Sequence, residues 1–524
     1  MSNTSDPSAL NYEAAPNAQR LLWAGFVAIL AAGVGFSVRG ASVLGAWSDA
    51  FGFTQTELGG ITGGGLIGFG IVIIISSFLA EAIGYGRLMY FAFAVHFLSA
   101  VVTLAAPFVF AAAGKDATFW TLFVGMFLFA IGNGVCEAVV NPLTATLFPN
   151  NKTHYLNILH AGWPAGLILG GVAAIFMADN VSWQVQISLF LVPVIIYGVM
   201  IFGQEMPKTD AAEAGVSLGE ILVQFAAPLL LFLLLIHAMV GYVELVTDSW
   251  IARITGSILN ETTGRWLFVY TSALMFILRF VAGPIVHKIS PLGLLFVSAI
   301  LAAVGLYTLG GVGTTAMALV ALTIYGLGKT FFWPTMLAVV SERFPKGGAV
   351  TLGMVGGVGM LSAGFLGGPG IGFKQDKYAS EKLQETSSAT YDRYKAGKEN
   401  TFLGVFSTNG LDGAKVGVLS DGGKGLQKEM EILANNEGSD TNLEALNTWW
   451  NDAKASADAD ATPVKEATLH GSRMALKLTA IVPAVMAVCY LLLLGYFKSI
   501  GGYKALTVEE QDGGSGGDDS GGDS

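Results

Sequence analysis

Residues 118–147 read TFWTLFVGMFLFAIGNGVCEAVVNPLTATL, an apolar run with a single charged side chain, Glu137. A helix needs roughly 20 apolar residues to cross the hydrocarbon of a bilayer, and this run is long enough. An ionisable side chain inside such a helix is costly and usually marks a solute or ion pathway. The stretch therefore predicts a transmembrane helix that carries a functional carboxylate.

The composition of the whole chain agrees with a membrane environment. Of 524 residues, 53% are hydrophobic and 13% are charged, and the mean hydropathy is +0.59. A water-soluble protein would carry more charge. The net charge of −10 comes from acids gathered in one long loop and in the C-terminal tail, which argues against a nucleic-acid partner. Cys136 and Cys489 both lie in apolar runs, so we expect no disulfide, no bound metal and no cofactor.

Apolar stretches of membrane-spanning length recur along the chain. They predict an all-α membrane protein with twelve transmembrane helices in two six-helix bundles. The predicted spans are 21–47, 59–83, 88–113, 118–147, 156–178, 184–203, 222–252, 266–288, 292–312, 315–341, 350–373 and 474–498.

The segments between and beyond these spans divide the chain. Residues 1–203 form the predicted N-terminal bundle, and a polar connector follows at 204–220. The C-terminal bundle takes spans seven to eleven from 221–373 and its last span from 470–500. Residues 374–469 contain no apolar span, and we expect them to fold as a small cap over the extracytoplasmic mouth. The acidic tail, 501–524, is expected to be disordered.

Loop charges predict the orientation in the membrane. Basic residues such as Arg20, Lys152 and Lys208 are concentrated in the short loops on the side of both termini. The positive-inside rule then places both termini in the cytoplasm. Residues 1–19 lack a basic segment followed by an apolar core, so we expect no cleaved signal peptide and a multi-pass protein of the cytoplasmic membrane.

The chain also contains an internal repeat. Span four reads GNGVCEAVVNP and span ten reads GLGKTFFWP, and a charged residue stands five positions before the proline in each, Glu137 and Lys329. A second match pairs SFLAEAIGYGR, which begins at Ser77, with GPIVHKISPLG, which begins at Gly283. Two related halves are typical of secondary transporters.

These features resemble the major facilitator superfamily. The motif between spans two and three has Glu81 where the family usually has aspartate and Ala82 in place of the usual arginine, while Arg87 supplies a basic residue. The resemblance implies that Glu81 and Arg87 form a cytoplasmic latch.

Within the superfamily, CEAVVNP followed by YLNILHAGWPAG, together with GYVELVTDSW in span seven, is similar to the fucose/glucose:proton symporter branch. That branch usually has an acid midway along the first span, where this chain has Arg39 instead. The resemblance also implies that spans one, four, seven and ten line a central cavity and that Glu137 handles protons.

Ionisable residues fall on those spans, and they are candidates for the solute site. Glu244 and Asp248 are one helical turn apart on span seven, and Arg39 and Lys329 lie on spans one and ten. One interpretation is that Arg39 and Lys329 pair with these acids to hold the halves together. The other is a solute pathway in which they neutralise Glu244, Asp248 or an anionic solute, with Glu137 as the acid that lacks a fixed partner. We expect Arg279, near the end of span eight, to be structural.

Aromatic and amide side chains near these charges are candidates for solute contacts. The set that could stack on a sugar ring or bond its hydroxyls comprises Trp163, Trp250, Trp333, Asn133, Asn141 and His160. Each tryptophan could equally be an interfacial or packing residue. We expect His96 and His237 to be hydrogen-bonded packing residues rather than ligands.

The sequence thus predicts a secondary transporter for a small polar solute, a sugar by resemblance, which acts by alternating access as a monomer and exchanges protons. An uncoupled facilitator or an organic-anion carrier fits the same residues. A solute sensor or a lipid flippase on this scaffold is an alternative of another class. We expect no enzyme activity, because Gly328-Lys329-Thr330 only imitates the end of a phosphate-binding loop and no strand precedes it.

Overall fold

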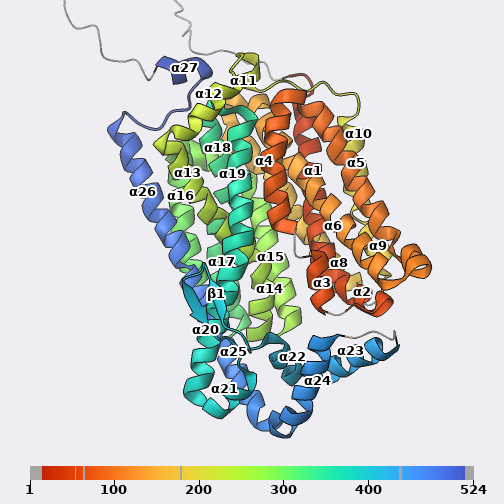
Figure 1. Ribbon diagram of the computed structural model, residues 1–524. Coiled ribbons are helices and arrows are strands. Elements are labelled where there is room, and N and C mark those ends of the chain that lie inside the picture. The colour runs from red at the N-terminus through yellow and green to blue at the C-terminus, as the bar shows by residue number, and fades with distance from the viewer. Residues whose placement is uncertain (1–14, 54, 63–64, 178–179, 436–439, 514–524) are drawn as a thin grey trace, which may run out of the picture.

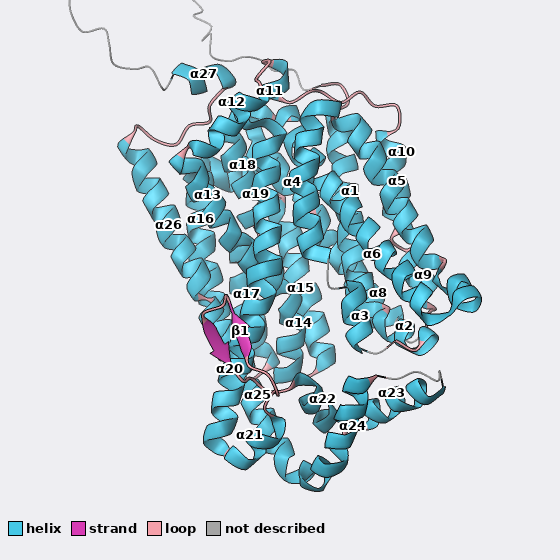
Figure 2. Cartoon of the chain, in the orientation of Figure 1, coloured by secondary structure: helices cyan, strands magenta, loops and turns pink. Residues whose placement is uncertain are grey.

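The computed structural model describes residues 15–53, 55–62, 65–177, 180–435 and 440–513. Nearly all of this part is helical, and it forms two bundles side by side, the first half of the chain in red to yellow and the second in green to blue (Figure 1). The described start of the chain, the connector and the last helix lie at one end of the bundles. The residues that follow span eleven lie at the other (Figure 2). We call these the terminal end and the insertion end.

The first half supplies spans one to six. Its elements are α1 (Ala18–Ser37), the π-helical turn η1 (Val38–Ser42), α2 (Leu44–Phe51), α3 (Gln55–Thr62), α4 (Gly65–Ile83), α5 (Tyr85–Leu104), α6 (Ala106–Leu147), η2 (Pro149–Asn151), α7 (Lys152–His160), α8 (Gly162–Met177), α9 (Trp183–Ser188) and α10 (Leu191–Ile201). Gly114 interrupts α6 with φ 77°, so the fourth span starts after it, as predicted.

The second half begins after a connector with α11 (Asp210–Glu213), α12 (Leu218–Val223) and η3 (Gln224–Ala226). Its membrane elements are α13 (Pro228–Val240), the π-helical turn η4 (Gly241–Val246), α14 (Thr247–Ile258), α15 (Glu261–Arg279), α16 (Ala282–Leu309), α17 (Thr315–Lys329), α18 (Phe332–Arg343), η5 (Pro345–Gly347), α19 (Gly348–Ser362), η6 (Ala363–Gly367), α20 (Gly368–Thr386), α25 (Ala457–Thr479) and α26 (Ile481–Ser499), followed by α27 (Val508–Gly513).

Eleven helical stretches among the described residues are long and apolar enough to cross a membrane. The predicted eighth span is not among them. Its helix α15 carries Glu261, Arg265 and Arg279 and several polar residues, which lower its hydropathy. The helix also starts earlier than predicted and bends at residues 280–281 before the chain enters α16.

Backbone irregularities recur at matching places in the two halves. Gly84, between spans two and three, has φ 82° and ψ 158°, and Ser290, between spans eight and nine, has φ 63° and ψ 163°. Each is the eighth residue of its copy of the repeated motif, although positive φ is uncommon for serine. The π-helical turns η1 and η4 likewise fall in spans one and seven. These agreements support the repeat read from the sequence.

Residues after span eleven form a small helical subdomain with its own apolar core. Its elements are α21 (Ser388–Tyr394), β1 (Asn400–Phe402), β2 (Phe406–Thr408), α22 (Gly413–Asp421), α23 (Lys424–Asn435), α24 (Thr441–Ala453) and η7 (Lys454–Ser456), held between the long helices α20 and α25. Leu383, Tyr394, Leu426 and Trp450 are among the side chains buried in that core. Because α20 and α25 continue from spans eleven and twelve, the subdomain is fixed to the second half.

Hydrogen bonds join the two halves at the terminal end. Thr153 Oγ1 lies 3.3 Å from Glu342 Oε1, and Asn157 Nδ2 donates to Thr335 Oγ1 at 3.2 Å. Lys152 Nζ donates to the carbonyl oxygen of Ser341 at 3.3 Å. These contacts connect spans five and ten and close the terminal end between them.

Candidate functional site

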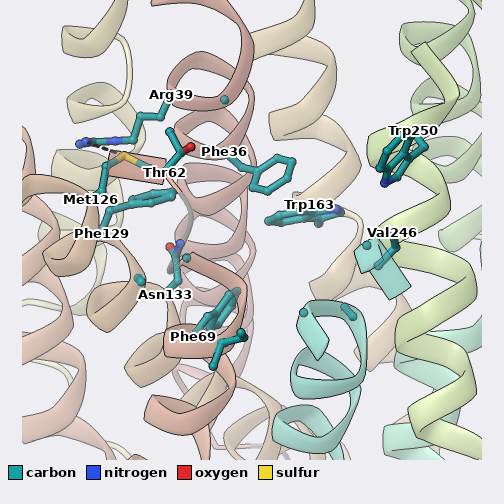
Figure 3. A pocket seen from close by; sticks show the side chains of 17 residues that line it. Phe36, Arg39, Thr62, Phe69, Met126, Phe129, Asn133, Trp163, Val246 and Trp250 are labelled. Carbon is teal, nitrogen blue, oxygen red and sulfur yellow. Dashed lines mark hydrogen bonds between the residues drawn. The ribbon is translucent and has the colours of Figure 1, made fainter. Parts of the chain in front are cut away.

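A cavity of about 300 Å³ lies between the two halves. The first half contributes Phe36, Arg39, Asn133 and Trp163, while Val246 and Trp250 line it from the second half (Figure 3). The volume is at the lower end of the range for small-molecule sites. The cavity therefore fits a small solute held between the halves.

One face of span five leads from the closed terminal end to this cavity. Thr153, Asn157, His160 and Trp163 follow at intervals of three or four residues, so they lie on one side of the helix. The first two contact span ten, His160 comes next, and Trp163 reaches the cavity. The cavity thus lies on the insertion side of the contacts that close the terminal end.

Glu137 is buried on span four and belongs to a hydrogen-bond chain. Its Oε2 accepts from Asn141 Nδ2 at 2.7 Å, and Asn141 Oδ1 lies 2.8 Å from His160 Nε2. Glu137 forms no ion pair with any described residue, whereas the two acids of span seven both do. The three polar residues predicted here are therefore brought together.

A smaller cavity of about 20 Å³ lies beside this chain. Its lining includes Glu137, His160, Glu244 and Arg279. A space of that size with several polar partners is enough for about one water molecule. The lining thus brings the carboxylate of Glu137 and the Glu244–Arg279 ion pair of the second half to the same small space.

The second half compensates its own charges. Lys329 forms a buried ion pair with Asp248, as one of the sequence interpretations proposed. Glu244 pairs instead with Arg279, whose Nη2 lies 2.7 Å from Glu244 Oε1. Each pair lies within the second half, so neither links the halves through two charges.

Arg279, which the sequence predicts to be structural, lies beside the candidate site. Besides Glu244, its guanidinium donates to the carbonyl oxygen of Thr330 at 3.0 Å and to the carbonyl oxygen of His160 in the first half. It therefore connects the ion pair of span seven to span five. The available signal was its position inside a predicted span, the same argument that selected the other charges.

Arg39 has no carboxylate partner among the described residues, so the predicted pairing with Glu244 or Asp248 is wrong. Its Nη1 donates to Thr103 Oγ1 and its Nη2 to Ser99 Oγ, each at 2.9 Å. The guanidinium also lies over the ring of Phe129, 5.0 Å from the centroid. Span one turns this side chain toward span three rather than toward span seven.

The three candidate tryptophans have different positions. Trp163 and Trp250 line the cavity from opposite halves (Figure 3). Trp333 is buried outside the lining of this cavity, where its backbone N–H donates to Glu244 Oε2 at 3.0 Å. Trp333 therefore positions the ion pair and lies outside the larger cavity.

The two histidines predicted to be hydrogen-bonded packing residues differ. His96 Nε2 lies 3.0 Å from Asn133 Oδ1 and its Nδ1 lies 2.9 Å from Tyr197 Oη, which holds Asn133 at the cavity wall. His237 is fully buried against Trp333, with ring centroids 4.6 Å apart, and neither ring nitrogen has a partner among the described residues. The hydrogen-bonded interpretation is wrong for His237.

Of the two residues predicted to form the cytoplasmic latch, only Glu81 makes side-chain hydrogen bonds with other described residues. Glu81 Oε1 accepts from the backbone N–H of Ala349 at 2.7 Å, at the start of span eleven, and Glu81 Oε2 accepts from Thr209 Oγ1 at 2.8 Å. The carboxylate thus caps a helix of the other half, where the helix dipole favours negative charge. Arg87 is exposed and its side chain bonds to no described residue, so only Glu81 of the two predicted latch residues bonds to the other half.

Comparisons with known proteins agree with this architecture. Residues 24–368 match the model of the Major Facilitator Superfamily. The E. coli fucose:proton symporter FucP, in its outward conformation, is similar to this chain with a TM-score of 0.57, at 18% identity over 69% of this chain and 92% of that one. A double-tryptophan mutant of XylE, the E. coli proton:xylose symporter, gives a TM-score of 0.61 at 11% identity over 95% of this chain and 98% of that one. Among curated proteins, none matches this chain by sequence.

Two helical bundles with a cavity between them define a multi-pass membrane protein of the secondary-transporter class. The family match covers most of the chain. This chain therefore belongs to the major facilitator superfamily.

Proposed function

We propose that this protein is a secondary active transporter that carries a small polar solute, a sugar, across the cytoplasmic membrane by alternating access. The observation that carries the proposal is the cavity of about 300 Å³ between the halves, with tryptophans on two sides and an amide at its wall. Aromatic faces and a few polar groups suit a sugar ring, because they match its apolar faces and its hydroxyls. The sugar symporters among the structural neighbours, FucP and XylE, support the same solute class.

Proton coupling is assigned to Glu137. The carboxylate starts a hydrogen-bond chain through Asn141 to His160, whose carbonyl oxygen accepts from Arg279. Protonation makes the carboxyl group a weaker acceptor for the Asn141 amide and adds an O–H donor, which changes the hydrogen-bond chain that ends beside Arg279 of the second half. A proton on Glu137 thereby changes the contact between the halves, and the loaded carrier can turn over.

The direct test is transport in proteoliposomes that contain the purified chain. Counterflow against a panel of labelled hexoses, organic anions and amino acids identifies the solute class. Uptake of protons from a weakly buffered medium on addition of that solute then tests coupling. Net uptake of the solute without any pH change would leave a facilitator and contradict the role of Glu137.

A second candidate, an organic-anion carrier, is favoured by one observation. Arg39 is buried beside the cavity without a carboxylate partner among the described residues, and its Nε bonds to no other group. A buried cation without a counter-charge is costly, and an anionic solute would supply one. Competition separates the two candidates. If the protein carries anions, a monocarboxylate should displace a bound sugar acid. If it carries neutral sugars, the monocarboxylate should leave a bound sugar in place.

The orientation completes the proposal. Both termini face the cytoplasm, and residues 374–469 form a cap at the extracytoplasmic mouth of a monomer. Protease added to intact cells should then cleave the chain within 374–469 and leave the connector at 204–220 untouched. Cleavage of the connector alone would reverse the assignment.

A further inference from the structure

The β-hairpin of the insertion presents an apolar tip that the packing of the protein leaves uncovered. Strands β1 and β2 pair Phe402 with Phe406 across the turn. Leu403, Val405 and Phe406 are 59%, 76% and 55% exposed. Exposed apolar residues this close together on one tip indicate an interaction surface.

The turn at the tip places a leucine in a backbone conformation that is unfavourable for this residue type. Val405 N–H donates to the carbonyl oxygen of Phe402, and the two residues between them, Leu403 and Gly404, have φ of 56° and 68°. Turns of this kind favour asparagine or aspartate followed by glycine, because leucine is disfavoured at positive φ. A leucine at this position is therefore favourable only where burial of its apolar side chain offsets the strain of its backbone conformation.

Contacts with α20 show which way the hairpin points. At its open end, Thr408 Oγ1 lies 3.4 Å from Ser380 Oγ. Toward its tip, the ring of Phe402 stacks on Phe373 with centroids 5.7 Å apart, and it passes so close to Gly370 that a Cβ there would lie 3.1 Å from Cζ. Since α20 begins at Gly368 directly after span eleven, the tip points back toward the membrane-spanning part of the bundle.

Along the axis of the helix bundle, the tip lies at the same height as the beginning of the lipid-facing surface. Lys374 Nζ lies 3.4 Å from Thr479 Oγ1, so this turn of α20 is level with the beginning of span twelve. Ile481 and Val485 follow on α26 and are 56% and 45% exposed. Figure 2 shows the hairpin in magenta on the flank of the bundle beside that end of α26. The apolar tip is thus continuous with the apolar belt of the spans.

We propose that the tip formed by Leu403, Gly404, Val405 and Phe406 is buried in the lipid bilayer at the insertion-side surface. The occupant of this surface is lipid, because the tip extends the belt that already faces acyl chains and carries no charged residue. The hairpin then anchors the insertion to the membrane at a point outside the bundle, and the subdomain moves with the second half and with the bilayer surface together.

Spin-label accessibility in proteoliposomes tests this proposal. Cys136 and Cys489 are replaced by alanine in the full chain, and a nitroxide is placed at Val405, at Val488 on the lipid-facing side of α26, or at Glu431 on the exposed side of α23. We expect the label at 405 to collide more often with oxygen than with a water-soluble nickel chelate. The label at 488 should show the same preference, and the label at 431 the reverse one. A water-like profile at 405 overturns the proposal. Low accessibility to both reagents also overturns it, since a protein partner would then cover the tip.

A second measurement serves if the cysteine-free chain does not insert. Val405→Trp in the otherwise native chain adds one fluorophore to the ten tryptophans present. Lipids brominated near the headgroup should quench this added emission, whereas the added emission of Glu431→Trp should be unchanged. Equal quenching of the two variants, or none in either, rejects lipid burial of the tip.

Discussion

The two halves of the protein treat buried charge in different ways. In the second half, Glu244 and Asp248 each have a cationic partner, Arg279 and Lys329. In the first half, Glu137 and Arg39 are buried with neutral hydrogen-bond partners only. Paired charges hold a fixed arrangement, while a carboxylate with neutral partners can gain or lose a proton at lower cost. We therefore expect the proton-sensitive group to lie in the first half, and the two ion pairs to hold the buried centre of the second half in place.

The largest effect is expected from breaking a pair in the second half. Lys329→Ala leaves Asp248 buried without its partner, which should cost about 3–5 kcal/mol of stability. The double variant Lys329→Met with Asp248→Leu should recover most of that loss, because it removes both charges. Thermal denaturation in detergent measures both, with Lys288→Ala as an exposed control on the same half. A double variant no more stable than the single one would show that the pair is not the stabilising feature.

Removing the carboxylate of Glu137 should affect function more than stability. Glu137→Gln mimics the protonated state, so accumulation driven by a proton gradient should fall at least about ten-fold, equivalent to about 1.4 kcal/mol. Exchange of solute across the membrane should continue, because the empty carrier is not required to release a proton in that assay. Accumulation and counterflow are measured in the same vesicles, with Glu213→Gln as a surface control. Unaltered accumulation in Glu137→Gln would assign coupling elsewhere.

A smaller effect is expected at the terminal end, where the halves meet. Glu81→Ala removes the cap of the Ala349 N–H, and helix caps contribute about 1 kcal/mol. The equilibrium should shift by about five-fold toward the state that is open at the terminal end. Labelling of a cysteine introduced at Asn157 by a membrane-impermeant thiol reagent in inside-out vesicles reports that shift. Arg87→Ala is the matched control and should leave the labelling rate unchanged; an equal increase in both variants would contradict the latch.

The smallest effect on stability is expected at Arg39. Arg39→Gln removes a charge that has only neutral partners and keeps an amide donor for Ser99 or Thr103, so stability should change by less than about 1 kcal/mol. This near-neutral outcome, set against Lys329→Ala, is the sharpest test of the difference between the halves. Sugar uptake should also be retained, whereas loss of anion uptake would favour the second candidate function. A loss of stability similar to that of Lys329→Ala would mean that Arg39 has a counter-charge after all.

The sequence predicted the positions of the helices better than their contacts. The lengths of the apolar stretches predicted the positions of the spans. The alignment of the repeated motif pairs Gly84 with Ser290, and the structure gives these two residues similar dihedral angles. The eighth span was predicted with other limits, and its helix α15 has low hydropathy because Glu261 and Arg265 stand at its exposed start and Thr271, Ser272 and Arg279 are buried. The domain limits and the roles of the site residues stay predictions.

Pairing inside the site could not be read from the sequence. A helix that is buried on most of its sides shows no apolar stripe, so its rotation is not encoded in a simple period. Arg39 therefore looked equivalent to Lys329, although it turns toward Ser99 and Thr103. The contacts of Arg279 could not be predicted for the same reason, since only the packing of spans five, seven and ten brings it to Glu244 and His160.

The π-helical turns of spans one and seven have a consequence for how the cavity closes. Each turn divides its span into two helices, α1 and α2 on either side of η1 and α13 and α14 on either side of η4. A π turn breaks the regular ladder of backbone hydrogen bonds, so bending concentrates there. We expect α2 and α14 to tilt over a bound solute while α1 and α13 keep their packing, which gives an occluded intermediate before the bundles exchange access. Distances between probes at Ser48 and Arg253 should then shorten on solute binding before any change between probes at Thr153 and Glu342; simultaneous changes would mean that the bundles move as single rigid bodies.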